Sequence, residues 1–373
     1  MNKTTHFTVI GAGHGGKAMA ADLSAKGFPV TLYNRTQQRI HDIALRGEIV
    51  LEYESGARRH CKIDKATADV AEALIDANVI MVVVPSSAHR DVARACAPHL
   101  RDGQIVILNP GRTGGALEFH QILSAEHCEA GVILAETATF VFASRSTGPT
   151  QARIMRQKNA VPLAALPATR TGHVLEAVCE AYPNFIPAPN VLYTSLDNMG
   201  AIFHPALTLL NAGWIESTKG DFQFYVDGVT PSTAQVLSAL DRDRVTVAAA
   251  LGVQARDAAT WLRDAYSAEG DTLYERMQNN PGYKGIRAPG TLNHRYIFED
   301  VPFSLVPIAS LGKQYGVDTP AIDSIIQLAC VVHGTNYRKR GRTTRDVGIA
   351  GLNVPEVKDF VDEGTLEPFH RSR

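Results

Sequence analysis

The sequence lacks the features of a nucleic-acid-binding or membrane-spanning protein. Its 37 basic and 38 acidic side chains give a formal net charge of -1, so no basic field is present to attract nucleic acid or an anionic membrane. No stretch approaches the roughly 18 uninterrupted apolar residues that a membrane span requires. No internal repeat or low-complexity segment is found either. With 45% hydrophobic and 20% charged residues, the composition is that of an ordinary globular chain.

Cysteine is scarce and does not form a pattern. The five cysteines are widely spread, and none has CxxC or Cys/His ligand spacing, which predicts reduced thiols and no metal site. The first residues run directly into an apolar run that begins at Phe7, which predicts no signal peptide. We therefore expect a cytoplasmic protein. The length of 373 residues suggests two domains.

The most informative stretch runs from Phe7 to Arg39. A short apolar run leads into Gly11, Gly13 and Gly16 in GxGxxG spacing, and about twenty amphipathic residues later a second apolar run follows. Gly11 permits a tight turn, Gly13 lets the backbone approach a pyrophosphate, and Gly16 lets the helix pack close to the strand. The alternative is a set of glycines that merely form a turn. Because both strands and the helix are present, the pattern favours a Rossmann-type dinucleotide-binding unit.

The end of the second apolar run bears on which dinucleotide is bound. An NAD site usually has Asp or Glu here, whereas an NADP site supplies Arg for the 2′-phosphate. This chain has Asn34 and Arg35, with Arg39 one helical turn further on. A guanidinium can bind the phosphate bidentately and stack on the adenine. We predict a preference for NADP(H), with NAD(H) still possible; the alternative is that Arg35 is a solvated turn residue.

Two more apolar runs end in loops that could reach the cofactor. The first stops at Pro85 and Ser86, and the second leads into a glycine-rich loop that contains Asn109 and Gly111. Ligands of open α/β sheets bind beyond the carboxyl ends of the strands. We expect Pro85 and Ser86 beside the cofactor ribose and the glycine-rich loop near the nicotinamide. An ordinary strand-to-helix turn would explain that loop equally simply.

The sequence pattern changes near residue 185. Before it, alternation with a Glu54-Ser55-Gly56 turn predicts a hairpin or edge strands over Glu48–Ile63. Beyond it, apolar residues recur with helical period in Ser195–Asn211, Thr230–Leu251, Ala255–Ala268, Val306–Tyr315 and Thr319–Val332. We predict an α/β Rossmann-type N-terminal domain over residues 1–185, followed by a mainly α-helical domain over residues 186–373. The substrate is expected in a cleft between them.

His204 is the candidate acid or base of the second domain. A hydride transfer from nicotinamide requires a group that gives or takes a proton at neutral pH, and histidine is the usual choice. His204 lies inside an apolar helical run and precedes Pro205, which disfavours regular helix at this point. This predicts a kink that faces a cavity. The alternative is a buried histidine bonded to a backbone carbonyl.

A polar cluster, Asn293–Asp300, lies in an irregular segment of the same domain. Its Arg295 could clamp a carboxylate bidentately, and its acidic side chains could orient an imidazole. A surface ion-pair network would have the same composition, so both interpretations stay open.

Several motifs together resemble the octopine/nopaline-type opine dehydrogenases over about residues 5 to 355. They are GAGHGG, NPGRTGGALEF, NVLYTSLDNMGAIFHPALTLLNAG, NPGYKGI, LNHRYIFEDV and YRKRGRTTRDVGIAGL. The resemblance implies a Rossmann-type domain and a helical domain. It also implies NAD(P)H-dependent reductive condensation of an amino acid's α-amine with a 2-oxo acid such as pyruvate, giving a secondary amine dicarboxylate.

The same resemblance implies roles for four residues. The family's catalytic histidine falls on His204, its carboxylate partner on Asp300 and its upstream asparagine on Asn198. Arg295 matches the residue that binds a substrate carboxylate. The chain departs from an NAD-type pattern at Asn34, where an acidic residue would otherwise follow the second strand.

Two other functions remain open. One is an NADP-dependent reductase of a free carbonyl, of the 2-hydroxy acid or ketopantoate type, which would need no amino acid. The other is a nucleotide-sensing protein without redox chemistry, which would be favoured if His204 and Asp300 were far apart. The sequence does not identify the amino acid or the 2-oxo acid, because their pocket is assembled by folding. A homodimer is compatible with the sequence, although no single segment demonstrates it.

Overall fold

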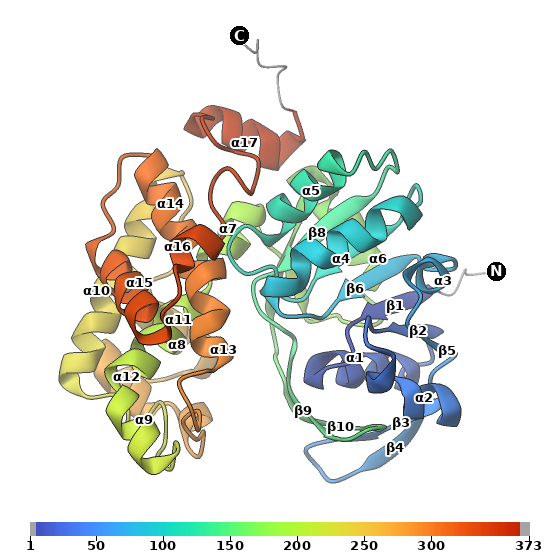
Figure 1. Cartoon of the computed structure of the whole chain (residues 1–373), viewed down its shortest axis with the longest axis horizontal. Helices are drawn as coiled ribbons and strands as arrows, with labels where there is room; N and C mark the ends of the chain where they lie inside the picture. Colours follow the sequence, from blue (N-terminus) through green and yellow to red (C-terminus); the bar gives the residue numbers. More distant parts are fainter. Residues whose placement is uncertain (1–4, 366–373) are drawn as a thin grey trace. The chain divides into compact units, whose positions relative to one another are not determined.

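The computed structural model describes residues 5–365, which form two compact units (Figure 1). The first unit comprises Met1–Thr194 together with Lys358–Arg373, and the second comprises Ser195–Val357. The sequence pattern changes near residue 185, whereas the units part between Thr194 and Ser195; the domain limits 1–185 and 186–373 stay a prediction. None of the helices in residues 5–365 has the length and apolarity that crossing a membrane would require.

An eight-stranded sheet forms the centre of the first unit, in the order β12-β11-β8-β7-β6-β1-β2-β5. Its strands are β1 (Phe7–Ile10), β2 (Val30–Tyr33), β5 (Lys65–Thr67), β6 (Val79–Val82), β7 (Ile105–Leu108), β8 (Ile133–Thr137), β11 (Val161–Leu166) and β12 (Phe185–Pro187). Six strands, from β5 to β8, run parallel, and β11 is antiparallel to β8. The four central strands β1, β2, β6 and β7 are buried on both faces, as expected of continuous apolar runs.

Helices connect the parallel strands. They are α1 (His14–Ala25), α2 (His41–Arg46), α3 (Val70–Leu74), α4 (His89–Cys96), α5 (Gly115–Ala125) and α6 (Thr171–Val178), with 3₁₀ turns η1 (Gln37–Arg39), η2 (Ser86–Ala88), η3 (Ala97–His99) and η4 (Ala168–Arg170). Helix α17 (Val354–Glu363) returns to this unit, where the ring of Phe360 packs edge-on against His120 at a centroid distance of 5.3 Å. The predicted Rossmann-type architecture of the N-terminal part is confirmed.

A second, four-stranded sheet covers part of the first unit, in the order β4-β3-β10-β9. Its strands are β3 (Glu48–Glu52), β4 (Arg58–Lys62), β9 (Phe142–Gly148) and β10 (Gln151–Gln157). The antiparallel pairing of β3 with β4 confirms the predicted hairpin. The sequence does not predict that β10 pairs with β3 in parallel, because that contact joins segments far apart in the chain.

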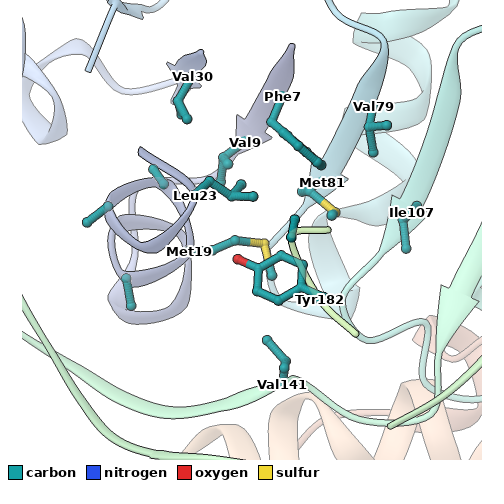
Figure 2. Close-up of a cluster of buried hydrophobic side chains, with 14 of the residues drawn as sticks. Phe7, Val9, Met19, Leu23, Val30, Val79, Met81, Ile107, Val141 and Tyr182 are labelled. Carbon is teal, nitrogen blue, oxygen red and sulfur yellow. The ribbon is translucent and has the colours of Figure 1, made fainter. Parts of the chain in front are cut away.

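Apolar side chains from both sheets and from α1 form one core cluster (Figure 2). Met19 and Leu23 of α1 lie between Val9 of the main sheet and Val141, which precedes the second sheet. All four side chains are fully buried. Burying a side chain of this size contributes roughly 1.5–3 kcal/mol, so α1 is held from both sides.

The second unit is helical. Its elements are α8 (Met199–Leu210), α9 (Ala212–Thr218), α10 (Pro231–Ala250), α11 (Ala258–Tyr266), α12 (Leu273–Asn279), η5 (Pro281–Tyr283), α13 (Arg295–Phe298), the π-helical turn η6 (Val301–Leu305), α14 (Val306–Gln314), α15 (Pro320–His333) and α16 (Tyr337–Arg340). Helix α7 (Val191–Leu196) leads into it from the first unit. Thr230 caps α10 by accepting a hydrogen bond from the N–H of Thr233.

One predicted helix is wrong in its extent. Ser195–Asn211 is broken: α7 ends at Leu196, and α8 begins at Met199. Pro205 lies inside α8, and the helix continues past it to Leu210. The interruption lies instead at Asp197 and Asn198, where the side chains of Arg244, Arg256 and Ser304 bond to the chain.

Candidate functional site

The glycine-rich turn follows β1, and each glycine has a distinct geometry. Gly11 has φ +112°, and a Cβ there would lie 2.4 Å from the carbonyl oxygen of Val83. A Cβ on Gly16 would lie 1.6 Å from the carbonyl oxygen of Gly11, so only glycine lets α1 pack against the turn. Around Gly13 a Cβ would meet no atom of residues 5–365 within 4 Å. Gly11 and Gly16 therefore build the turn, and Gly13 leaves its outer side open.

The N-terminus of α1 is suited to an anion. Among the described residues, no side chain caps α1 at Gly13, and its first turn contains no acidic residue. The N–H groups at a helix N-terminus and the helix dipole both favour negative charge. This end of α1 fits a dinucleotide pyrophosphate.

Lys17 of α1 ties the second sheet to this turn. Its buried ammonium donates to the carbonyl oxygen of Pro149 at 2.7 Å, in the β9–β10 connection. One turn earlier, Nδ1 of His14 accepts from the N–H of Ser146 at 2.9 Å. Burial lowers the pKa of Lys17, and the nearby positive charge of Arg39 lowers it further. Sequence reasoning did not identify Lys17, because its partners lie about 130 residues away.

The predicted NADP-selective residues follow β2. Oδ1 of Asn34 accepts from the N–H of Ala12 at 3.0 Å, which fastens this loop to the glycine-rich turn. Arg39, at the end of η1, is exposed. Nη1 of Arg35 pairs with Oδ2 of Asp91 at 3.0 Å. The sequence shows no carboxylate next to Arg35, but folding brings one there from α4.

The loops after β6 and β7 hold the other predicted cofactor residues. Pro85 and the buried Ser86 lie three and four residues after the end of β6 at Val82. Asn109 is buried and donates from Nδ2 to the carbonyl oxygen of Ile107 at 2.8 Å. Its buried Oδ1 has no hydrogen-bond partner among the described residues. Buried amides are usually fully bonded, so Asn109 retains an acceptor for a further group.

Gly111 makes room for a buried carboxylate that the sequence analysis did not single out. A Cβ on Gly111 would lie 2.1 Å from Oε2 of Glu136. That oxygen accepts from the N–H of Ala116 at 2.8 Å, and Oε1 accepts from Oγ1 of Thr194 at 2.6 Å. Glu136 thereby fixes the start of α5 and the loop before it. Gly111 thus has a packing role, and its part in cofactor binding stays a prediction.

In the helical unit, His204 and Asp300 lie in direct contact. Nδ1 of His204 lies 2.8 Å from Oδ2 of Asp300, across 96 residues of sequence. A carboxylate accepts only, so Nδ1 carries the proton and donates. The side chain of Asp300 is 0% exposed and that of His204 is 19% exposed. A buried carboxylate thus fixes one nitrogen of a partly exposed imidazole, and no residue between 5 and 365 forms a hydrogen bond with Nε2.

Tyr296 holds the imidazole from its face. The two rings stack with centroids 4.0 Å apart and planes 16° from parallel, and Tyr296 also stacks on Phe224 at 5.3 Å. Nothing in the sequence marks Tyr296 as a site residue except its place beside Arg295. Together, Asp300 and Tyr296 fix both the tilt and the rotation of the His204 ring.

Asn198 lies at the break between α7 and α8. Its Nδ2 donates to Oγ of Ser304 at 2.9 Å, in the turn that follows Asp300. The break is held by Arg256, whose Nη2 lies 2.5 Å from Oδ2 of Asp197, and by the fully buried Arg244, which donates to the carbonyl oxygen of Leu196. Burial raises the pKa of Asp197, while its bond to Arg256 opposes that shift.

Arg295 lies one helical turn before Glu299 and pairs with it. Nη2 of Arg295 is 2.7 Å from Oε2 of Glu299; the arginine side chain is 48% exposed and the glutamate 2%. The guanidinium is thus oriented by a buried carboxylate and still faces solvent. It can accept a second anion through its remaining N–H groups.

We predict that Tyr296→Leu lowers kcat roughly three- to tenfold, because the stacked contact that holds the imidazole is lost. Tyr296→Phe keeps the ring and should stay within about twofold of the unchanged protein. The measurement is steady-state kinetics, with kcat and KM determined separately. Equal activity of the leucine and phenylalanine variants would show that the stack does not position His204.

Known protein families match both parts of this chain. The family model for the NAD/NADP octopine/nopaline dehydrogenase α-helical domain matches residues 187–333, and that for the NAD-dependent glycerol-3-phosphate dehydrogenase N-terminus matches residues 6–126. The opine dehydrogenase of Arthrobacter sp. (strain 1C) is 39% identical over 97% of this chain and 100% of its own length.

Two solved structures share the fold. An octopine dehydrogenase with NADH and L-arginine has a TM-score of 0.81 and 20% identity, covering 98% of this chain and 100% of its own. A yersinopine dehydrogenase with NADP+ bound has a TM-score of 0.77 and 18% identity, covering 97% of this chain and 99% of its own. The likeness therefore extends over both units.

Proposed function

Because this chain belongs to the octopine/nopaline family of opine dehydrogenases, we propose that it condenses the α-amine of an amino acid with a 2-oxo acid such as pyruvate. The amine and the ketone lose water to form an imine, which NAD(P)H and a proton reduce to a secondary amine dicarboxylate. The 39% identity over nearly the full length of both proteins carries this proposal. The reaction is reversible: the secondary amine can be oxidised back to the imine, which water hydrolyses to the amino acid and the 2-oxo acid.

The first unit fits a nicotinamide dinucleotide, which supplies the hydride when bound. Gly13 leaves the outer side of the turn open, and the N-terminus of α1 faces the expected pyrophosphate. Pro85 and Ser86 would lie by the ribose, and Asn109 and Gly111 near the nicotinamide. The unbonded Oδ1 of Asn109 supports a contact of this kind.

His204 would transfer the protons of the condensation. With Nδ1 bonded to Asp300, Nε2 can take a proton from the substrate ammonium and return it to the hydroxyl that leaves as water. Asp300 would stabilise the imidazolium that forms between these steps. Asn198 would hold the substrate near the imidazole. Arg295 would bind the carboxylate of the 2-oxo acid, which its exposed guanidinium can reach.

We further propose that NADP(H) is preferred to NAD(H). Asn34 stands where an acidic residue would favour NAD, and Arg35 and Arg39 carry positive charge next to it. The enzyme would be cytoplasmic, which its five free thiols support, since disulfides are rare in that compartment; cell fractionation tests this.

A substrate matrix tests the proposed reaction. NADPH oxidation is measured with 2-oxo acids and amino acids, each omitted in turn, and activity is expected only when both are present. Arg295→Met should raise KM for the 2-oxo acid and leave KM for NADPH unchanged. Activity with a 2-oxo acid alone would instead establish the carbonyl reductase.

The other two functions have weaker support. A carbonyl reductase would share the first unit, but the full-length relative at 39% identity is an opine dehydrogenase. A nucleotide sensor would require His204 and Asp300 to be far apart, but their side chains lie 2.8 Å from each other.

A further inference from the structure

The ion pair between Arg35 and Asp91 links two loops that flank the glycine-rich turn. Arg35 follows β2, and Asp91 lies in the first turn of α4, which follows β6. Strands β2 and β6 both pair with β1, one on each side, and β1 leads into the turn. The pair therefore joins the carboxyl ends of the two strands next to β1. The adenosine part of a dinucleotide binds at this edge of a Rossmann-type sheet.

Both partners are accessible to a ligand. The side chain of Arg35 is 76% exposed and that of Asp91 is 58% exposed, with 3.0 Å between Nη1 and Oδ2. Ion pairs this exposed are weak and are screened by salt, so a ligand anion can displace the carboxylate. Within residues 5–365, Arg35 is the hydrogen-bond partner of the Asp91 carboxylate, so replacing Asp91 breaks this one side-chain contact.

We propose that Asp91 sets how strongly this enzyme discriminates NADP(H) from NAD(H), by competing with the 2′-phosphate for the guanidinium of Arg35. This inference rests on the proposed binding of NADP(H) by the first unit. A phosphate monoester carries about −1.5 to −2 charges at neutral pH and binds arginine bidentately. To bind Arg35, the 2′-phosphate of NADP(H) must therefore displace the carboxylate of Asp91. The phosphate then remains close to that carboxylate, which is also negatively charged. NAD(H) has no group at this position that requires Arg35.

The expected effect of removing the carboxylate is a gain in affinity. Asp91→Asn keeps the size of the side chain and frees Arg35, so Kd for NADPH should fall roughly two- to fivefold. Kd for NADH should remain within about twofold of its original value. The gain should disappear when Arg35 is also replaced, because there is then no guanidinium to compete for.

The experiment measures Kd for NADPH and NADH by fluorescence titration at fixed low salt, using Asp91→Asn, Arg35→Ser and the double variant. Glu126→Gln is the matched control: Glu126 follows α5, and its replacement removes one negative charge from another exposed ion pair, formed with Arg94 of α4 at 3.5 Å. Because Arg35, Asp91 and Glu126 are all exposed, thermal unfolding should be nearly unchanged in every variant.

Each outcome has a definite meaning. A gain for NADPH alone in Asp91→Asn, absent from Glu126→Gln and from the double variant, supports the proposal. An unchanged or weaker Kd for NADPH overturns it, and so does an equal gain for both cofactors, which would show that Asp91 obstructs adenosine in general. If Arg35→Ser itself leaves the affinity for NADPH unchanged, the proposed NADP preference fails separately.

Discussion

Replacing His204 by alanine is expected to remove about 3–5 kcal/mol of transition-state stabilisation from the condensation. The imidazole is the proposed proton carrier, and its Nδ1 is fixed 2.8 Å from a fully buried carboxylate oxygen. The binding of NADPH should be intact, because the proposed cofactor residues belong to the other compact unit. The comparison to make is kcat/KM for both substrates together with Kd for NADPH.

The matched control replaces a histidine that lies outside the proposed site. His173 is exposed on α6, in the first unit, so His173→Ala should retain full activity. Near-native turnover of His204→Ala would exclude the proposed role, whatever the result for His173. A loss of NADPH binding in His204→Ala would indicate damage to the fold instead of a missing acid or base.

The second large effect concerns two glycines of the same turn. Replacing Gly16 should destabilise the fold, whereas replacing Gly13 should weaken cofactor binding alone. Gly16→Ala places a methyl group 1.6 Å from the carbonyl oxygen of Gly11, a backbone atom that cannot rotate away. We expect a loss of about 2–3 kcal/mol in unfolding free energy, a Tm lower by roughly 5–10 °C and no cofactor binding. Differential scanning calorimetry and NADPH titration measure these changes.

Gly13→Ala is the contrasting variant. Gly13 has φ −79°, which alanine also adopts, and its Cβ would meet no atom of residues 5–365 within 4 Å. Stability should therefore be unchanged, whereas Kd for NADPH should rise on the order of tenfold or more, because the methyl group takes the space through which the pyrophosphate approaches. If Gly13→Ala binds NADPH normally, the pyrophosphate does not pass this side of the turn.

The elements that were predicted correctly are those whose signal is local in sequence. Strand β1, the GxGxxG turn and α1 follow from apolar runs and glycine spacing within thirty-three residues, from Phe7 to Arg39. The hairpin of β3 and β4 follows from alternation about a short turn. Helix α10 follows from the helical period of Thr230–Leu251. The resemblance to the opine dehydrogenases, rather than periodicity, assigned the residue pair His204 and Asp300.

What was missed depends on contacts between distant segments. Strand β9 has the polar sequence FASRSTG, and its place is fixed by β10 and by Lys17 of α1. The helix break at Asp197 depends on Arg256, and the carboxylate beside Arg35 comes from α4. The buried Glu136 explains Gly111 only after the chain has folded. A single sequence does not show such pairings, since each partner alone looks like an ordinary polar residue.

The return of the chain to its first unit makes the helical unit an insertion. Residues 358–365 belong to the same compact unit as residues 5–194, and Oδ1 of Asp362 accepts from Nδ2 of Asn190 at 2.7 Å. The nucleotide-binding unit is thus encoded in two separate pieces. Exchanging the helical units of two relatives therefore requires two junctions, one on each side of Ser195–Val357. During synthesis, the nucleotide-binding unit can be completed only after the whole helical unit has been translated.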